Sequence, residues 1–307
     1  MLVVTQEVTP LFSIIVTCFN KRDTIVRAIK SAVQQAELGH LRVEVIVVDD
    51  ASTDGSREIL AALNHPEVAL LFIEQNQGAL RAYLRGFARA TGQYVVMLDG
   101  DDILAPNSLA AIQAADLLQG EATCIRMKIA ELTSDACHSE RLAPKIKQRF
   151  SPAYWFAIMQ NTGGTAYIFP RALLARLTGK WPDISVQDHI LPGVMALHAQ
   201  RFLKLDMVGY LMDSAVDSNS LSTQTPRIHR DRLISDAFIM KEAQRTALPR
   251  LPRFLLRLGT ALRVKKLGRV YGASHAGLIK MVFGRAQALA QAREAVLSAI
   301  ASAQAGG

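Results

Sequence analysis

Cysteine is scarce in this sequence. The three cysteines, Cys18, Cys124 and Cys137, show neither the pairing of a disulfide framework nor the spacing of a metal site. Cys18 and Cys124 lie in apolar runs, where a free cysteine behaves as a small core residue. Because a protein without disulfides suits a reducing compartment, we expect a cytoplasmic location, at the inner face of a membrane if the chain binds one.

Long hydrophobic runs are also missing. No stretch of about 18 uncharged apolar residues occurs, so we expect no membrane-spanning helix. Residues 1–10 lack a basic segment followed by an apolar one, so no signal peptide is expected. Half of the 307 residues are nevertheless hydrophobic and 20% are charged, which is typical of a globular protein with a sizeable core.

Acidic residues become rare towards the C-terminus. From Lys241 onward 12 lysines and arginines stand against 2 acids, and since the whole chain has a net charge of +8, the first 240 residues carry −2. Basic and apolar residues alternate over 251–270, a pattern typical of a helix that lies on an anionic membrane, packs within the protein or forms a homodimer. We expect no nucleic acid partner, because Tyr271 is the only aromatic residue beside the basic cluster at 263–269.

Strand-like and helix-like segments alternate over the first hundred residues. Apolar runs at 12–18, 43–48, 68–73 and 95–98 predict four strands, of which the first and the fourth should be buried. Apolar residues at helical spacing between 25 and 33 predict the first helix. Further helices are expected up to Leu63 and from Gln77 to about Ala90. These short β-α-β connections predict an α/β fold with a parallel, doubly wound sheet and right-handed crossovers.

Acidic residues follow two of these strands. Asp50 ends the second, and Asp99, Asp101 and Asp102 follow the fourth, separated only by Gly100. Because ligands bind at the carboxyl ends of strands in open α/β sheets, both acidic loops should line one edge. Carboxylates this close repel one another unless a cation lies among them, and oxygen clusters suit Mg²⁺ or Mn²⁺. The alternative is a polar turn in which aspartates cap backbone amides and Gly100 has a positive φ.

These motifs resemble those of family 2 glycosyltransferases of the GT-A fold, in order and spacing. The segments that carry the resemblance are Ser13-Ile14-Ile15-Val16-Thr17-Cys18-Phe19-Asn20, Val47-Val48-Asp49-Asp50-Ala51-Ser52-Thr53-Asp54-Gly55-Ser56, Asn76-Gln77-Gly78, Ala90-Thr91-Gly92-Gln93-Tyr94 and Leu98-Asp99-Gly100-Asp101-Asp102. The resemblance is close over 11–110 and looser to about 215. It implies a GT-A domain over 1–225, with a Rossmann-like nucleotide-sugar half (11–110) and an acceptor half (111–225), followed by a basic helical extension over 226–307.

The resemblance implies a site for a nucleotide-diphosphate sugar. Thr17, Phe19 and Asn20 lie in the segment that flanks the base, although most relatives have tyrosine at Phe19, so the phenol hydrogen bond is lost. Asp50 matches the acid that pairs with the base, typically a uracil imide, so a UDP-sugar is the expected donor. The alternative for Asp50 is capping of the following helix, which Asp54 serves equally well.

Other donor contacts implied by the resemblance each have a structural alternative. Arg81 and Arg85 lie one helical turn apart and either reach the diphosphate or form a solvated face, and their register departs from the family pattern. Backbone amides of Gly163 or Gly164 either face the donor or belong to a tight turn.

The Asp-x-Asp pair of the family matches Asp99 and Asp101. The resemblance implies that Asp101 is a direct ligand of Mn²⁺ or Mg²⁺, while Asp99 or Asp102 holds the ribose or a metal-bound water. His229 either joins the metal or diphosphate or is a solvated helical histidine. Such a metal stabilises the charge that builds on the departing diphosphate.

Asp188 matches the catalytic base of the family. Inverting transfer needs a carboxylate that accepts the proton of the acceptor hydroxyl. Gln187 replaces the glutamate that usually precedes this aspartate, and His189 is a second candidate base. Because Asp188 precedes an apolar helical run, it also suits the N-cap of that helix, and the two roles are compatible.

The predicted function is therefore a metal-dependent inverting glycosyltransferase acting on a hydroxyl of a glycan or lipid-linked glycan. A nucleotidyltransferase is one alternative, although residues 19–23 contain no glycine for a triphosphate loop. A non-catalytic sugar-nucleotide-binding protein is another, favoured by the departures at Phe19 and Gln187. In the acceptor half we expect a helix to about Leu118, a strand over 122–130, a loop over 133–149, a helix over 154–159 and a polar loop over 213–225, and in the extension a helix over 286–303.

Overall fold

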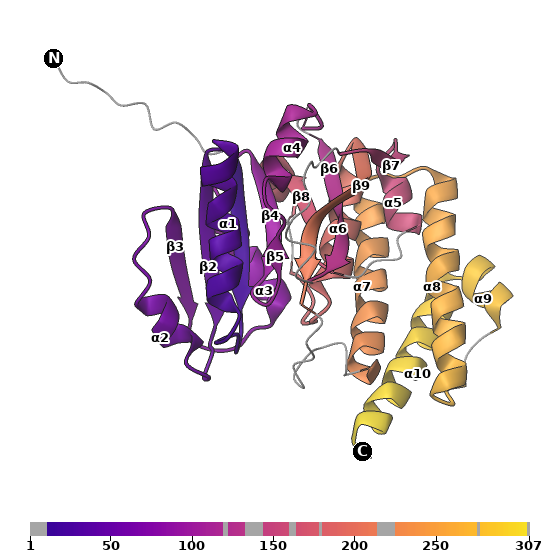
Figure 1. Cartoon of the computed structure of the whole chain (residues 1–307). Coiled ribbons are helices and arrows are strands. Elements are labelled where there is room, and N and C mark those ends of the chain that lie inside the picture. The colour runs from indigo at the N-terminus through magenta and orange to yellow at the C-terminus, as the bar shows by residue number, and fades with distance from the viewer. Residues whose placement is uncertain are drawn as a thin grey trace. The chain divides into compact units, whose positions relative to one another are not determined.

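A computed structural model of the chain describes residues 11–118, 122–132, 144–159, 164–177, 180–213, 225–274 and 277–305 (Figure 1). Its contacts group the chain into two compact units. The first, which we call the sheet unit, comprises Met1–Arg149, Gly164–Thr178 and Ala199–Ala215. The second, the helical unit, comprises Phe150–Gly163, Gly179–His198 and Val216–Gly307.

The described strands form one nine-stranded sheet in the order β3-β2-β1-β4-β8-β6-β9-β5, with β7 paired to β9. Their bounds are β1 (Phe12–Cys18), β2 (Val43–Asp50), β3 (Val68–Ile73), β4 (Tyr94–Asp99), β5 (Ile103–Leu104), β6 (Thr123–Glu131), β7 (Ile146–Phe150), β8 (Tyr167–Pro170) and β9 (Arg201–Met212). The four predicted strands β1 to β4 are all parallel, which confirms the parallel sheet predicted for the first hundred residues. Beyond β4 the sheet is mixed, because β8 runs antiparallel to both β4 and β6.

Helices cover both faces of β1. The helices of the sheet unit are α1 (Ile25–Gly39), α2 (Ser56–Ala61), α3 (Ala79–Arg89), α4 (Ser108–Ala114) and the 3₁₀ helix η2 (Arg171–Arg176). Apolar residues of α1 share a core with Ile14 and Val16 of β1. On α3, Gly86 approaches Ile15 so closely that a Cβ would collide with its side chain. Since neighbouring strand residues point to opposite faces, α1 and α3 pack on opposite sides, as a doubly wound sheet requires.

Three local features of the sheet unit differ from the sequence prediction. Residues 146–150, expected within a loop, form β7, whose largely exposed polar side chains leave no apolar alternation to detect. The helix expected to reach Leu118 ends at Ala114, and Asp116 has a φ of +53°, which a helix does not accommodate. β9 was not predicted. The remainder of the expected loop, 133–143, lies outside the described residues.

The helical unit has a core of its own. Its helices are α5 (Tyr154–Met159), α6 (Gln187–His198), α7 (Thr225–Arg245), α8 (Arg250–Val270), α9 (Leu278–Phe283) and α10 (Ala286–Ala305). Leu233 of α7, Val264 of α8, Met281 of α9 and Val296 of α10 belong to one buried cluster. The helices expected over 154–159 and 286–303 are confirmed, whereas the short α9 was not predicted.

The contacts group the chain differently from the predicted division at residue 225. α5 and α6, which we placed in the acceptor half, pack with α7 and α8 and therefore belong to the same compact unit as the C-terminal helices. None of the helices in the described ranges has a stretch both long and apolar enough to cross a bilayer.

Candidate active site

The two acidic loops lie at the same edge of the sheet unit. β1 lies between β2 and β4 and is parallel to both. Cys18 at the end of β1 is in register with Asp49 of β2, and Thr17 is in register with Asp99 of β4. The carboxyl ends of the first, second and fourth strands therefore bring Asp50 and the three carboxylates after β4 to one side of the sheet, as the topology predicted.

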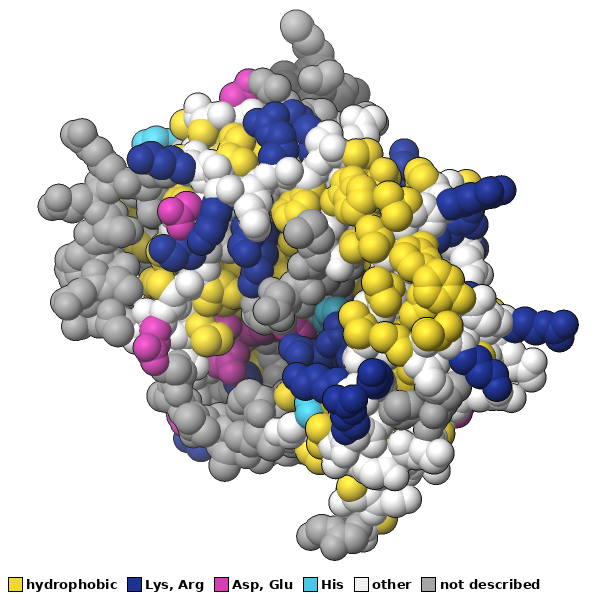
Figure 2. Space-filling model, turned by 90° about the vertical axis from the view of Figure 1, so that its right-hand side faces the viewer, with side chains coloured by type: hydrophobic (Ala, Val, Ile, Leu, Met, Phe, Trp, Pro, Cys, Tyr) yellow, Lys and Arg dark blue, Asp and Glu magenta, His cyan; other side chains and the backbone are white. Residues whose placement is uncertain are grey.

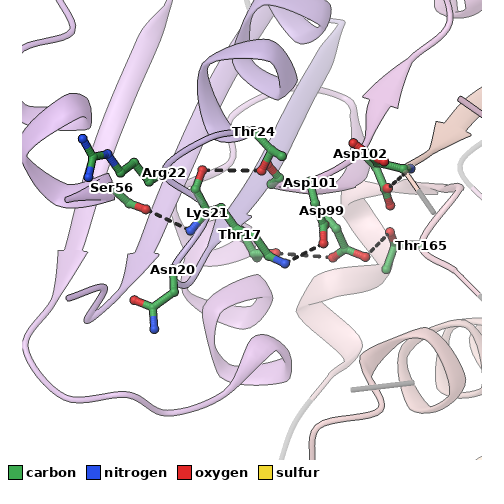
Figure 3. Close-up of polar contacts among 12 residues, drawn as sticks. Thr17, Asn20, Lys21, Arg22, Thr24, Ser56, Asp99, Asp101, Asp102 and Thr165 are labelled. Carbon is green, nitrogen blue, oxygen red and sulfur yellow. Dashed lines mark hydrogen bonds and ion pairs between the residues drawn. The ribbon is translucent and has the colours of Figure 1, made fainter. Parts of the chain in front are cut away.

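Asp99 is held in place by hydroxyl groups. Its Oδ1 accepts hydrogen bonds from Tyr83 at 2.8 Å and from Thr17 at 3.4 Å, and its Oδ2 accepts one from Thr165 at 2.8 Å (Figure 3). These donors come from β1, α3 and the segment before β8. Because both carboxylate oxygens are already in use, Asp99 is a fixed acceptor at the rim, and neither Tyr83 nor Thr165 was identified from the sequence.

Asp102 is buried, with 6% of its surface exposed. Tyr210 of β9 donates a hydrogen bond to its Oδ2 at 2.8 Å, and the backbone N–H of Asp213 donates one to its Oδ1 at 2.9 Å. Burial, together with the charges of Asp99 and Asp101, raises the pKa of Asp102 to about 7 despite these two bonds. Near neutral pH the cluster therefore carries less than three full negative charges.

Asp101 is the accessible member of the cluster. Its side chain is 36% exposed, and its Oδ2 lies 2.6 Å from the ammonium group of Lys21 (Figure 3). Arg27 of α1 donates a hydrogen bond to the backbone carbonyl of Asp101 at 3.0 Å. Two cations from the segment after β1 thus flank this loop. Neither was identified from the sequence, although the adjacency of β1 and β4 in a doubly wound sheet is the signal that places their exit loops together.

The donor set fits a metal shared with a ligand rather than a metal held by the protein alone. Within the described ranges no group of three or more His, Cys, Asp or Glu side chains could hold a metal ion. The oxygens of Asp99 and Asp102 accept hydrogen bonds, which leaves Asp101 as the carboxylate open to a new partner. Mg²⁺ is commonly bound by one or two carboxylates together with substrate phosphates, and Asp101 suits that arrangement.

His229, expected either to join the metal or diphosphate or to be a solvated helical histidine, has a tyrosine as a partner. It lies on α7 in the helical unit, half-buried, with its Nδ1 2.9 Å from the hydroxyl of Tyr271. Burial and the nearby charges of Arg232, Lys266 and Arg263 lower the pKa of His229. Its observed partner is therefore a tyrosine, rather than solvent or an acid of the sheet unit.

Gly100 is required by a close approach and not by its φ. The positive φ that the alternative of a polar turn assigned to Gly100 is not observed, because Gly100 is absent from the positive-φ residues of this region. A Cβ on Gly100 would lie 2.6 Å from the carbonyl oxygen of Thr17, too close for any side chain. Glycine thus lets the loop after β4 lie directly against β1, which keeps Asp99 within reach of Thr17.

The loops after β1 and β2 are tied together by Asn20. Its backbone N–H donates to Ser52 Oγ at 2.9 Å, and its Oδ1 accepts from the backbone of Thr53 at 2.8 Å. Asn20 adopts a φ of +54°, which asparagine tolerates better than most residues. The neighbouring Phe19 is 45% exposed, so its ring is available for packing against a ligand. Asn20 therefore positions this loop through its own hydrogen bonds.

Asp50 makes contacts that neither sequence interpretation anticipated. It is 2% exposed, and its two oxygens accept the backbone N–H groups of Gln77 at 2.8 Å and Gly78 at 2.7 Å, just before α3. Burial and the charge of Asp49 raise the pKa of Asp50, while these two bonds oppose the rise. At the helix that follows β2 the N-cap is Gly55, and it is Asp54 that accepts the backbone N–H of Ser56, the first helical residue, at 2.9 Å. Asp50 thus fixes the entry to α3.

The remaining donor candidates are placed as follows. Arg81 is half-buried in the first turn of α3, and Arg85 lies one turn later and is exposed. Gly164 has a φ of +75° and directly precedes Thr165, the partner of Asp99, so its conformation favours glycine. Gly163 lies outside the described residues.

Asp188 lies half-buried in the first turn of α6, in the helical unit. His189, the residue after Asp188, anchors the start of this helix. His189 Nε2 lies 2.9 Å from Asp236 Oδ1 on α7, and Asp236 Oδ2 accepts a hydrogen bond from Arg263 of α8 at 2.7 Å. Burial opposes ionisation of Asp236, but His189 and Arg263 outweigh it and lower the pKa of Asp236. His189 therefore faces Asp236, and the Asp188 carboxylate sits on an anchored helix start.

We expect Asp236→Ala to lower the free energy of unfolding by about 2–3 kcal/mol, since removing one member of a buried ion pair leaves the others without their partner. Arg263 is 34% exposed, so its guanidinium regains some hydration when Asp236 is removed. The loss of stability is therefore expected to be smaller than for a fully buried ion pair. Asp206→Ala is the matched control, because Asp206 is 51% exposed and its ion-pair partner among the described residues is Lys128, at 3.5 Å. Thermal denaturation of both variants measures the difference; equal midpoints would contradict the anchoring role.

The parallel strands β1 to β4 and the acids at their carboxyl ends are features of an α/β protein of the GT-A type. Residues 13–172, more than half of the chain, match the model described as "Glycosyl transferase family 2", and the chain belongs to this family. This membership agrees with the family that the motifs resemble.

Relatives with known names match part of their length. The succinoglycan biosynthesis protein ExoO of Rhizobium meliloti is 32% identical over 173 residues, covering 54% of this chain and 49% of that protein. The glycosyltransferase GlyG of Streptococcus pneumoniae is 32% identical over 104 residues, covering 33% of this chain and 34% of that protein. The matches thus span half or less of these relatives' own length.

Solved structures match over most of the chain. S. aureus TarS 1–349 in complex with UDP-GlcNAc has a TM-score of 0.64 at 18% identity, covering 96% of this chain and 92% of that one. The mannosyltransferase PcManGT of Pyrobaculum calidifontis, in complex with GDP-Man and Mn²⁺, has a TM-score of 0.58 at 22% identity, covering 96% and 87%. At these identities the likeness shows the fold, which confirms the predicted GT-A architecture.

Proposed function

We propose that this protein is a metal-dependent inverting glycosyltransferase that moves a sugar from a nucleotide-diphosphate donor to a hydroxyl of a glycan or lipid-linked glycan. The observation that supports it best is the state of the cluster after β4. Asp99 and Asp102 are held by hydrogen bonds, while Asp101 stays accessible and is paired with Lys21 at 2.6 Å. A carboxylate beside a cation, at the ligand-binding edge of a parallel sheet, suits the diphosphate end of a donor.

In this proposal the residues of the sheet unit bind and orient the donor. Phe19 packs against the base, and Asp99, held by Thr17, Tyr83 and Thr165, forms the rim against which the ribose lies. Asp101 would hold a divalent cation, and Mn²⁺ or Mg²⁺ would supply Lewis-acid stabilisation of the leaving group there. Lys21 then becomes free to turn from Asp101 towards a phosphate oxygen. Asp50 supports this site by accepting the backbone N–H groups of Gln77 and Gly78, which holds the start of α3 in place. This role is independent of any contact with the base.

Asp188 is the proposed base. Its carboxylate accepts the proton of the acceptor hydroxyl as the new glycosidic bond forms, a service typically worth about 10²–10⁴ in rate. The assignment follows the family motif position and is supported by the anchored start of α6. Gln187 next to it is 8% exposed, with an Oε1 for which the described residues offer no hydrogen-bond partner. A buried acceptor of this kind is typical of a functional position.

The donor nucleotide and the acceptor are proposed from chemistry and from the relatives. TarS binds UDP-GlcNAc and PcManGT binds GDP-Man, so UDP is our first choice and GDP our second. The name of ExoO refers to succinoglycan biosynthesis, which favours a polysaccharide intermediate as acceptor. We further propose that the reaction takes place in the cytoplasm.

The test is release of nucleoside diphosphate from a panel of UDP-, GDP-, CDP- and dTDP-sugars with Mn²⁺. We expect one nucleotide to be turned over, with about 10²-fold or greater loss when EDTA removes the metal, because charge on the leaving group is then unscreened. Release of pyrophosphate from a nucleoside triphosphate would instead establish a nucleotidyltransferase. Tight binding of one sugar nucleotide without any turnover or transfer would establish a non-catalytic binding protein.

A further inference from the structure

A cavity of about 500 Å³ opens on the helical unit between α7, α8 and α10. Its lining is strongly basic, and the cations concerned are Lys241, Arg250, Arg253, Arg257 and Arg293. None of the described residues that line it is acidic. The two acids of residues 241–307 are already paired, Glu242 with His198 and Arg245, and Glu294 with Arg293. The cavity therefore has a positive charge that the helical unit does not balance.

Three of these cations are available to a ligand. Lys241, Arg250 and Arg253 are exposed, and no carboxylate of the described residues lies within ion-pair distance of them. Arg257 has a structural task, because its guanidinium donates to the carbonyls of Met281 and Gly284 at the end of α9. Lysine and arginine side chains that converge without acids are the usual recognition chemistry for phosphate.

An exposed apolar surface adjoins the cavity. Phe254 lines the cavity, and its ring centroid lies 5.5 Å from that of Phe283 on α9. Phe283 is 74% exposed, Ile279 is 78% exposed and Leu251 is 59% exposed. Figure 2, which faces the side on which α8 and α9 are drawn in Figure 1, shows hydrophobic side chains gathered there with lysine and arginine side chains around them. Aromatic and aliphatic side chains this exposed indicate a binding surface.

We propose that this cavity and the α9 surface bind an anionic phospholipid of a bilayer. The phosphate lies among Lys241, Arg250 and Arg253, and the hydrocarbon chain lies against Phe254 and Phe283. Basic side chains that border an apolar helix face are typical of peripheral membrane attachment. A second copy of the chain fits less well, because a two-fold contact would bring the same unbalanced cations together. The proposal does not depend on the transferase activity.

The test is flotation of the full chain with vesicles of phosphatidylcholine alone or with phosphatidylglycerol. We expect the phosphatidylglycerol vesicles to bind at least about tenfold more tightly, because each cation near an anionic surface adds to the affinity. The double variant Arg250→Gln/Arg253→Gln should lose about tenfold or more of this affinity. Its matched control is Lys266→Gln/Arg269→Gln, which removes the same charge from exposed positions on the same helix outside the cavity.

The apolar part is tested in the same assay with Phe283→Ser, for which we expect about tenfold weaker vesicle binding. Val270→Ser is its control. Val270 is 60% exposed and is the last residue of α8, whereas Phe254, the ring partner of Phe283, lies near the start of that helix. Unchanged thermal midpoints establish that the variants fold. Equal losses in both charge variants, no binding to either vesicle, or stabilisation by inorganic phosphate without vesicle binding would each overturn the proposal, as would dimerisation through this surface.

Discussion

Asp101→Ala is expected to lower turnover by about 10³-fold or more while the protein stays folded, because the loss of a charge that stabilises the leaving group raises the barrier by several kcal/mol. Stability should change little, since the Asp101 side chain is 36% exposed and surface ion pairs such as that with Lys21 contribute about 0–1 kcal/mol. The measurement is the rate of nucleoside diphosphate release at saturating Mn²⁺, alongside the thermal midpoint.

Asp206→Asn controls for the general effect of removing an exposed carboxylate from the sheet unit. Asp206 is 51% exposed and pairs with Lys128, and it lies outside the cluster after β4. Its turnover should match that of the wild type. If Asp101→Ala retained full activity, the metal and diphosphate could not be held as proposed.

Asp188→Asn is expected to lower kcat by about 10²–10⁴ and to leave the KM for the donor nearly unchanged, because the amide keeps the shape of the side chain but cannot accept a proton. The asparagine keeps a polar side chain of the same size in the first turn of α6, so a loss of activity reports on proton transfer rather than on folding. The measurement is steady-state transfer to acceptor, with the thermal midpoint as a check.

Asp183→Asn is the matched control, because Asp183 is an exposed acid five positions earlier on the same segment. We expect wild-type kinetics for it. A wild-type kcat in Asp188→Asn would assign the base to another residue. A kcat loss accompanied by an equal rise in the donor KM would show a role in binding instead.

The periodicity of apolar residues was sufficient to predict the nucleotide-binding half of the sheet. β1, β2 and β4 are buried runs with turn residues at their ends, whereas β3, at the edge of the sheet, is only partly buried. The helices α1 and α3 bury one face each. Parallel topology then places the acids after β2 and β4 at one edge without further information. These features are local or follow from connection rules, and one sequence displays them directly.

The contacts that fix the acids could not be predicted in the same way. Thr165 reaches Asp99 across 66 residues, and Tyr210 reaches Asp102 across 108. Such partners depend on how β8 and β9 join the sheet, and no spacing in the sequence encodes it. The same reason explains Asp50, whose neighbours in the sequence suggested helix capping nearby. Its actual partners, Gln77 and Gly78, are 27 and 28 residues away.

The grouping of α5 and α6 with the C-terminal helices is a second long-range feature. Their sequence positions lie within the region of the family resemblance, which led us to place them in the acceptor half. The pairing of His189 with Asp236, 47 residues later, belongs to the packing that joins them to α7. The basic C-terminal extension, which we predicted as a separate region over 226–307, thus belongs to the unit that contains Asp188.

The central claim is that the diphosphate of the donor is bound at the exit of β4 through Asp101. A crystal structure of the protein with nucleoside diphosphate and Mn²⁺ tests it most directly. We predict manganese density in contact with the Asp101 carboxylate and a phosphate oxygen, and the Lys21 ammonium moved away from Asp101. Nucleotide bound at another edge of the sheet, or manganese held without Asp101, would contradict the account.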